Sequence, residues 1–318
     1  MSEERNPRRQ FLRQGAASLA VLYAGGSLAQ GRVTLKAGDQ KGGLRALLEG
    51  ANALEGVNYD IQWTEFPAAA PLAEALNAGA VDSGPIGDAP AIFALAAGTR
   101  IKLIGANRSD PYGTAVLVRP DSPLKTAADL KGKSIGTNRG SIGHYVALKA
   151  LESAGLGPND ANIRFLPPAD TKLALTNGSV DAWATWEPYT AMAETSGHAR
   201  VLVSGRGLSS GLSFLAATES ALATKRAALQ DFLQRVVRAQ RWSYQHVPEY
   251  SASLARIIGI APDAARLQFE RRNTQWRPID AELVATQQAT ADFYLKTGLL
   301  KQRLDVRQTF DTTFALPA

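Results

Sequence analysis

The sequence predicts an α/β protein made of two similar lobes that face a shared cleft. Residues 76–82 recur as residues 175–181 at an offset of 99, and residues 38–42 have a counterpart 98 positions later. Strand and helix patterns alternate through both copies, and 318 residues exceed the usual size of a single core. Chance matching of common residues is the alternative, and the near-constant offset in two separate segments argues against it. A cleft between lobes is a usual place for a small ligand.

In the first copy, apolar spacing and turn residues define each element in order. Residues 33–37 predict a short strand, and leucines on one face predict a helix from Gly42 to about residue 54. Residues 60–66 alternate as a half-buried strand does, and Pro67 ends that strand. The remaining elements are a helix at 71–77, a strand from 81, a helix at 89–97, and strands at 101–105 and 115–118.

The same plan returns after residues 120–123, where two prolines mark a boundary. The expected elements are a one-turn helix at 126–133, strands at 134–136, 162–166, 180–184 and 201–203, helices at 141–154, 170–177 and 188–195, and a returning strand at 214–218. Helices then follow at 227–246, 248–258, 262–269 and 280–297. We therefore expect lobe one at 33–117 plus 219–318 and lobe two at 118–218. Two crossings, near 118–120 and 216–218, would form a hinge.

Composition excludes several classes of function. The chain has no cysteine and three dispersed histidines, so a thiolate nucleophile, a Cys-ligated metal site and an HExxH-type zinc enzyme are not expected. No nucleophile elbow, Walker loop or dinucleotide motif occurs. Nucleic acid is not an expected partner, because no run of Lys and Arg or basic-aromatic stripe is present. We expect neither catalysis, nor a cofactor, nor a metal.

The N-terminus predicts export from the cytoplasm. Arg8 and Arg9 begin a twin-arginine signal, an apolar run follows at 16–24, and residues 27–29 offer a small-x-small cleavage site. The apolar run is too short, and too interrupted by glycine, for a membrane anchor. Residues 1–29 contribute a net charge of +2, which leaves +4 of the total +6 on the mature chain. The expected compartment is the bacterial periplasm.

Four loops carry a strand end into a helix start, at 39–43, 87–90, 139–144 and 185–188. Unpaired N–H groups at helix N-termini favour anions, so convergence of these loops on one cleft would make an anion site. Such turns occur in every α/β fold, and most of them bind nothing. Lys41 and Arg139 in these loops are expected to be rim charges that steer a ligand.

Several side chains in these loops have two possible roles. Asp88 is favoured as a cap of the following helix that accepts N–H groups near Ala91, while its own main chain faces a ligand. Glu187 either caps the next helix or meets a polar or cationic group of a ligand. Ser141 either donates a hydroxyl to an anion or caps its helix, and His144 either donates an imidazole N–H or lies at the surface.

Two tryptophans, Trp183 and Trp186, lie three residues apart at the end of the expected strand 180–184. One of them is expected to pack in the core. Trp186, next to the helix start, is the one that we expect to face the ligand.

These residues resemble the periplasmic solute-binding proteins of ABC importers for aliphatic sulfonates, close to those for taurine and nitrate. The resemblance is carried by segments 39–42, 65–68, 74–77, 87–90 and 122–132, most strongly by 178–189, and by 287–294 and 306–308. It implies the two-lobed periplasmic binding protein fold (type II), with a mixed sheet flanked by helices in each lobe. The site residues that it implies are Gln40, Gly87, Asp88, Ala89, Ser141, His144, Trp186 and Glu187. Members often carry a run of serines after the residue that matches Gly140, and this chain keeps only Ser141.

The resemblance also implies a monomer that binds an alkanesulfonate and delivers it to a membrane permease. Nitrate or taurine are the alternative ligands. The alternative from another class is a pyrimidine-precursor enzyme, or binding protein, of thiamine synthesis with the same fold. Such an enzyme would need further functional histidines or a cysteine-containing motif, which this chain lacks.

Overall fold

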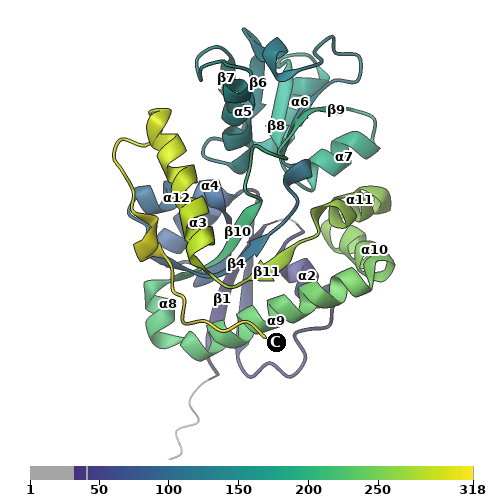
Figure 1. The fold of residues 1–318 in the computed structure, drawn as a ribbon. Coiled ribbons are helices and arrows are strands. Elements are labelled where there is room, and N and C mark those ends of the chain that lie inside the picture. The colour runs from purple at the N-terminus through teal and green to yellow at the C-terminus, as the bar shows by residue number, and fades with distance from the viewer. Residues whose placement is uncertain (1–31, 41, 318) are drawn as a thin grey trace, which may run out of the picture. The chain divides into compact units, whose positions relative to one another are not determined.

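The computed structural model describes residues 32–40 and 42–317, and these residues form two mixed sheets flanked by helices (Figure 1). The expected export signal at 1–29 and Lys41 lie outside the described residues. The six-stranded sheet has the order β11-β4-β10-β3-β1-β2, and the five-stranded sheet has the order β7-β6-β8-β5-β9. The α/β fold class with two mixed sheets is therefore confirmed.

The strands of the six-stranded sheet are β1 (Thr34–Gln40), β2 (Asp60–Phe66), β3 (Ser83–Gly87), β4 (Ile101–Arg108), β10 (Leu212–Thr218) and β11 (Gln275–Arg277). Those of the five-stranded sheet are β5 (Ala115–Val118), β6 (Ser134–Thr137), β7 (Asn162–Phe165), β8 (Ala182–Thr185) and β9 (Arg200–Ser204). β1 pairs in parallel with β2 and β3, and β6 pairs in parallel with β7 and β8. β10 and β5 are the antiparallel strands in the middle of each sheet.

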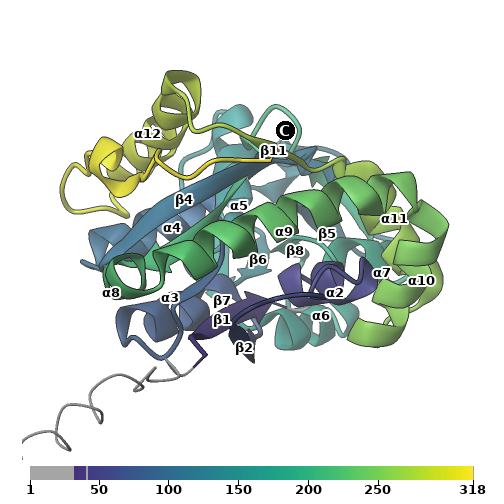
Figure 2. The same ribbon diagram turned by 90° about the horizontal axis from the view of Figure 1, so that it is seen from below.

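The α-helices of the described residues are α2 (Leu44–Gly50), α3 (Ala69–Asn77), α4 (Asp88–Ala96), α5 (Ile142–Ser153), α6 (Pro168–Thr176), α7 (Tyr189–Thr195), α8 (Glu219–Thr224), α9 (Arg226–Gln245), α10 (Val247–Ile258), α11 (Pro262–Arg272) and α12 (Ala281–Lys296). Short 3₁₀ helices occur at η1 (Pro111–Gly113), η2 (Ala127–Leu130) and η3 (Val306–Thr309). Figure 2 shows α9 lying along the six-stranded sheet, where its apolar face packs on β1 and β10.

The two copies of the sequence repeat make the same pair of hydrogen bonds, each through an aspartate. The N–H of Asp82 donates to the carbonyl of Lys36 at 2.7 Å, and the Asp82 carboxylate accepts the Lys36 N–H at 2.7 Å. Asp181 and Ser134 make the same two bonds at 3.0 and 2.8 Å. Each aspartate therefore ties the start of its own strand, β3 or β8, to the start of the neighbouring strand, β1 or β6.

The repeated glycines end matching helices. Gly79 and Gly178 follow α3 and α6 with φ of +68° and +78°, the left-handed conformation that stops a helix and that side chains disfavour. A Cβ on Gly136 in β6 would collide with the methyl group of Thr171 in α6, so this glycine sets how closely the helix approaches the sheet. The repeat in the sequence is thus a repeat in the structure.

Sheet membership differs from the expected division at residues 117/118 and 218/219. All of β5 pairs within the five-stranded sheet and all of β10 pairs within the six-stranded sheet, so the crossings lie at 109–114 and 205–211. The two crossings contact each other, because Ser109 donates its N–H to the carbonyl of Gly211 at 2.9 Å. The apolar runs of β5 and β10 are buried on both faces, so their pattern indicates strands without indicating which sheet they join. β11 was not expected.

Helix α12 packs against helices that belong to both sheets. The ring of Tyr294, which is fully buried, lies 4.6 Å from Phe93 of α4 and 5.6 Å from Tyr145 of α5, measured between ring centroids. One apolar cluster therefore joins α4, α5 and α12 on one side of the crossings.

A buried ion pair joins α11 to the segment around α7. The Arg271 guanidinium donates through Nε to Glu187 at 2.5 Å and through Nη1 to Glu194 at 2.6 Å. The side chain of Arg271 is 11% exposed and that of Glu187 only 5%. Burial raises the pKa of Glu187, while the bond from Arg271 opposes this rise. Arg271 therefore connects a helix of the six-stranded sheet to two carboxylates that follow β8 of the other sheet.

The hydrogen bonds between Asp181 and Ser134 predict that the protein loses stability at low pH. Burial opposes ionisation of Asp181, but the hydrogen bonds from Ser134 outweigh it and lower the pKa of Asp181. Its stabilisation is therefore present above the unfolded-state pKa, near 3.9, and is lost as the pH falls through the lower folded value. Asp181→Asn should reduce the free energy of unfolding by about 1–3 kcal/mol at pH 7. Urea titration should show the difference from wild type shrinking below about pH 4.

Asp121→Asn is the matched control, because the Asp121 side chain is 85% exposed and lies 3.6 Å from Arg119. It should leave the urea midpoint near that of wild type. Equal losses in the two variants would contradict the structural role given to Asp181.

The buried ion pair predicts a large effect of removing its arginine. Arg271→Met leaves the Glu187 carboxylate buried without a cation, and such unpaired buried charges typically cost about 3–5 kcal/mol of stability. Thermal and urea unfolding measure this loss. Arg266→Met on the same helix is the control, because the Arg266–Glu270 pair is exposed and should contribute little. Adding Glu187→Gln to Arg271→Met should restore part of the loss, and no restoration would argue against the ion pair as the cause.

Candidate functional site

A cavity of about 250 Å³ lies where elements of the two sheets and both crossings meet. Each of the four expected loops contributes to its wall. Five of the expected site residues lie there: Gln40, Gly87, Ser141, Trp186 and Glu187. Asp88, Ala89 and His144 are buried and do not belong to the wall. The structure therefore brings together the loops predicted from the repeat, but not every residue within them.

Helix α2 begins with its N–H groups already bonded. The carboxylate of Asp39 accepts the N–H groups of Leu44 at 2.9 Å and Arg45 at 2.7 Å. Asp39 is 4% exposed, and burial raises its pKa to about 6 although the bonds from Arg45 and Leu44 lower it. These donors are therefore not available to a ligand anion. Gln40, the next residue, holds its side-chain amide 3.5 Å from the carbonyl of Pro85, a long contact that leaves the amide accessible to the cavity.

Asp88 is the first residue of α4, and Gly87 holds the N-cap position that was favoured for Asp88. Its carboxylate accepts the N–H of Ala89 at 2.7 Å, rather than one near Ala91, and the hydroxyl of Ser210 at 2.5 Å. Burial raises the pKa of Asp88 to about 6, against the effect of these two bonds. Ser210 lies in the second crossing, so Asp88 also fixes that segment to α4. Gly87, the residue before the helix, is the part of this turn that reaches the cavity wall.

Glu187 caps α7 and is paired, so its two oxygens are engaged within the protein. One oxygen accepts the N–H of Ala191 at 3.0 Å and the other accepts from Arg271. This geometry matches the capping alternative for Glu187. A cationic group of a ligand would have to compete with the guanidinium of Arg271 for the same carboxylate.

Helix α5 differs from the other helix starts, because its cap is neutral. The Ser141 hydroxyl accepts the N–H of His144 at 3.1 Å and donates to the carbonyl of Asn138 at 2.7 Å. Its hydrogen is therefore engaged within the loop, which matches the capping alternative. With no carboxylate in its first turn, the partial positive charge of this helix end is left uncompensated beside the cavity.

His144 lies behind this helix start and is neutral at physiological pH. Its Nδ1 accepts the N–H of Gly140 at 3.4 Å, and its ring packs edge-on against Phe165 with 5.1 Å between centroids. Burial, and then the nearby Arg139, lower the pKa of His144 to about 4. The guanidinium of Arg139 lies over the ring of Phe165 at 3.8 Å. His144 therefore packs with its own loop, and it was expected at the surface or as a ligand donor.

The two tryptophans divide as predicted. Trp183 is 2% exposed and packs in an apolar cluster of the five-stranded sheet, whereas Trp186 lies in the cavity wall. Tyr189, whose ring meets that of Trp186 edge-on at 5.8 Å between centroids, lines the cavity beside it.

The residues that sequence reasoning missed lie on α11. Arg272 lines the cavity, and its guanidinium makes no hydrogen bond or ion pair with any residue that the structure describes. Gln268 lines the cavity one helical turn earlier, is 4% exposed, and its amide likewise has no partner in the described part of the chain. Positions i and i+4 share a helix face, so both point to the same cavity while Arg271 turns to Glu187.

The sequence carried a weak signal for this end of α11. We expected the helix to end near residue 269, but it continues to Arg272 and ends at Asn273, which has the left-handed φ of +43°. Asparagine is a common stop of this kind, and basic residues in a last turn are favoured by the helix dipole. These rules explain where Arg271 and Arg272 lie, but not which one faces the cavity.

Neither a membrane-spanning helix nor a metal-binding cluster occurs among the described residues. In the part of the chain that the structure covers, no helix has both the length and the apolar character needed to span a membrane. Within the same residues, no three side chains of His, Cys, Asp or Glu are grouped so that they could hold a metal ion.

Comparison with known proteins places this geometry in a family. The model of the NMT1-like family matches residues 44–259. A protein of Escherichia coli K12 named for the binding of aliphatic sulfonates is 37% identical over 278 residues, covering 86% of this chain and 87% of that protein. A protein of the same name from Bacillus subtilis 168 is 30% identical, covering 83% of this chain and 80% of its own.

A solved structure has the same fold over most of the chain. The alkanesulfonate-binding protein of Xanthomonas axonopodis pv. citri, bound to MOPS, is 32% identical, with a TM-score of 0.83 over 88% of this chain and 98% of that one. The chain belongs to the NMT1-like family, alongside relatives that are named for binding aliphatic sulfonates.

Proposed function

We propose that this protein is the periplasmic sulfonate-binding component of an ABC importer and performs no chemistry on its ligand. The observation that carries the proposal is the guanidinium of Arg272, which lines an aromatic-lined cavity and has no partner in the described residues. A sulfonate is ionised at every physiological pH, so its site needs hydrogen-bond donors and positive charge and needs no proton acceptor. The names of the relatives from Escherichia coli and Xanthomonas support the same ligand class.

The sulfonate oxygens are placed against Arg272, with the amide of Gln40, the main chain at Gly87 and the first turn of α5 that follows Ser141 as neutral donors. Trp186 and Tyr189 cover the bound group. Asp88, Ala89 and His144 lie behind this layer. Glu187 lines the cavity, but its carboxylate is engaged with Ala191 and Arg271. The proposed site therefore keeps part of the loop set predicted from the sequence and adds one arginine to it.

Delivery to a membrane permease, export through the twin-arginine pathway and a monomeric state complete the proposal. The mature chain begins after residue 29 in this view. Taurine, nitrate and sulfate are the competing ligands, and the cavity volume of about 250 Å³ supports an organic ligand over a bare inorganic anion. Turnover of any sulfonate on incubation, detected by analysis of products, would contradict a purely binding role.

Ligand titration tests the proposal. Isothermal calorimetry with methane-, butane- and octanesulfonate, taurine, sulfate and nitrate should give the strongest binding for an organic sulfonate. Arg272→Ala removes a charge-assisted hydrogen bond of about 1.5–3 kcal/mol and should weaken that binding roughly 10- to 100-fold. Arg266→Ala, which changes an exposed arginine on the same helix, should bind as wild type does. Unchanged affinity in Arg272→Ala would contradict a role of Arg272 in ligand binding. Tighter binding of nitrate than of any sulfonate would contradict the proposed ligand class.

Export gives a separate test of the proposed compartment. Changing Arg8 and Arg9 together to lysine should leave the precursor in the cytoplasm, because the twin-arginine pathway requires the arginine pair. Fractionation followed by immunoblotting measures the distribution. Normal recovery of processed protein from the periplasm in this variant would contradict the proposed route.

A further inference from the structure

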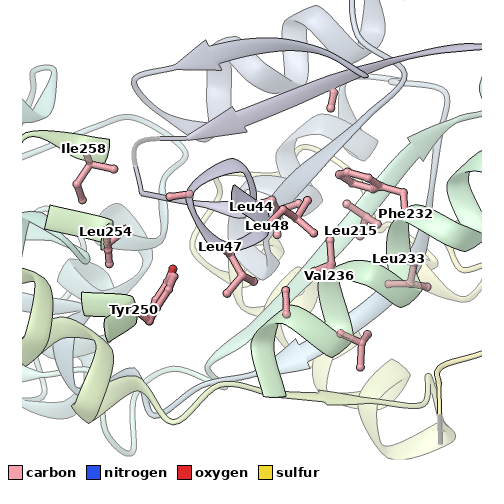
Figure 3. Close-up of a cluster of buried hydrophobic side chains, with 14 of the residues drawn as sticks. Leu44, Leu47, Leu48, Leu215, Phe232, Leu233, Val236, Tyr250, Leu254 and Ile258 are labelled. Carbon is pink, nitrogen blue, oxygen red and sulfur yellow. The ribbon is translucent and has the colours of Figure 1, made fainter. Parts of the chain in front are cut away.

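One part of the cavity, called the chamber below, is walled by apolar and aromatic side chains. Its wall is built by α2, α9, α10, α11 and β11. The residues that line it are Leu44, Leu47, Tyr244, Tyr250, Leu254, Phe269 and Trp276. Figure 3 shows Tyr250 and Leu254 of α10 on the side that faces Leu44 and Leu47 of α2. A ligand's charged group has no partner on these surfaces, so the chamber suits the uncharged remainder of a ligand.

The aromatic side chains of this chamber are held in fixed orientations. Tyr244 stacks on Phe269 with 4.3 Å between ring centroids, and Tyr250 meets Phe269 at 4.7 Å with its edge. The hydroxyl of Tyr244 accepts the N–H of Thr274 at 2.6 Å, which fixes that ring further. Rigid aromatic walls favour flat rings, because offset stacking and edge-to-face contacts add to the burial of apolar area. A flexible alkyl chain makes neither contact and must also give up rotational freedom on binding.

Gln268 is a polar residue of this wall, which also holds the indole N–H of Trp276, buried without a hydrogen-bond partner in the described residues. Residue Gln268 is 4% exposed and lines the cavity, and its amide has no hydrogen-bond partner in the described residues. A polar side chain placed in this way in an apolar pocket is available to orient a ligand. The other glutamine of the wall, Gln240, differs because its amide donates to Ser243 at 3.2 Å.

Gln268 and Arg272 lie on the same face of α11, so one ligand can contact both. They are four residues apart on α11, about one helical turn or 5.4 Å along the axis. A six-membered ring with substituents on opposite sides holds its two polar groups apart at a fixed separation, so each can meet a different side chain. A sulfonate on one side of such a ring would reach Arg272 while a hydroxyl or ether oxygen on the other side reached Gln268.

We propose that the preferred ligand is a sulfonate on a six-membered ring that carries a hydrogen-bonding substituent opposite the sulfonate, with Gln268 as the residue that selects this substituent. The inference rests on the proposed function, because it assigns the sulfonate to Arg272. It goes further by naming the ring and its substituent as the features that the protein reads.

The role of Gln268 is tested by comparing the affinities of two ligands for wild type and for two variants. The ligands are 4-hydroxybenzenesulfonate and 4-methylbenzenesulfonate, which have similar shapes and differ in one hydrogen-bonding group. In wild type the hydroxyl ligand should bind about three- to tenfold more tightly, as expected for one net hydrogen bond. In Gln268→Leu this preference should disappear or reverse. Gln240→Leu is the control and should keep it.

Folding and chain shape are controlled separately. If Gln268→Leu has a lowered melting temperature, Gln268→Met replaces it, since methionine has a similar length and no hydrogen-bonding amide. Hexanesulfonate, which is linear and has the same number of carbons as the ring, should bind less tightly than 4-hydroxybenzenesulfonate. Calorimetry on the purified mature chain provides all of these constants.

The outcomes separate this inference from the proposed function. A wild-type preference that survives unchanged in Gln268→Leu and Gln268→Met overturns the role of Gln268. If hexanesulfonate binds more tightly than 4-hydroxybenzenesulfonate, the preference for a ring is overturned. The proposal of a sulfonate-binding protein then still stands. Absence of binding for every sulfonate overturns the proposed function itself.

Discussion

The contact of Arg271 with Glu187 and Glu194 sets the arrangement on which the cavity depends. This one guanidinium, buried between α11 and the α7 segment, connects the two sheets on the side opposite the aromatic cluster of α12. Because Arg271 faces the two carboxylates, its neighbour Arg272 and the preceding turn with Gln268 face the cavity. Two consecutive arginines thus have separate tasks: the first holds the walls together and the second offers a positive charge inside them.

The acidic side chains around the cavity explain why such a charge is needed. Asp39, Asp88 and Glu187 each bond to N–H groups at the start of a helix, so the ends of α2, α4 and α7 are compensated from within. A site built from helix N-termini alone would therefore retain only α5, capped by the neutral Ser141, for an anion. One helix end contributes on the order of 0.3–1 kcal/mol, which is far below the roughly 8 kcal/mol of micromolar binding. Arg272 fills this gap in the electrostatics.

Much of the fold could be predicted from the sequence because it depends on local patterns that occur twice. The strand-starting aspartates, Asp82 and Asp181, and the helix-ending glycines, Gly79 and Gly178, act within a few residues of their own element or on the adjacent strand. The loops around the cavity followed from the same repeat. Arg272 and Gln268 could not be predicted in this way, because α11 has no counterpart in the first half. Which of its faces meets the cavity is decided by Glu187 and Glu194, some 80 residues away in the chain.

The buried carboxylates also show how the protein balances stability against the charge of its site. Burial raises the pKa of Asp39 and of Asp88 to about 6, so the folded state holds these protons more tightly than the unfolded chain does. A raised carboxyl pKa means that stability from these groups falls as the pH rises from about 4 through about 6. At neutral pH both groups are ionised and add negative charge behind the wall, which opposes an anion in the cavity. In the proposed site, Arg272 supplies the positive charge that offsets these carboxylates.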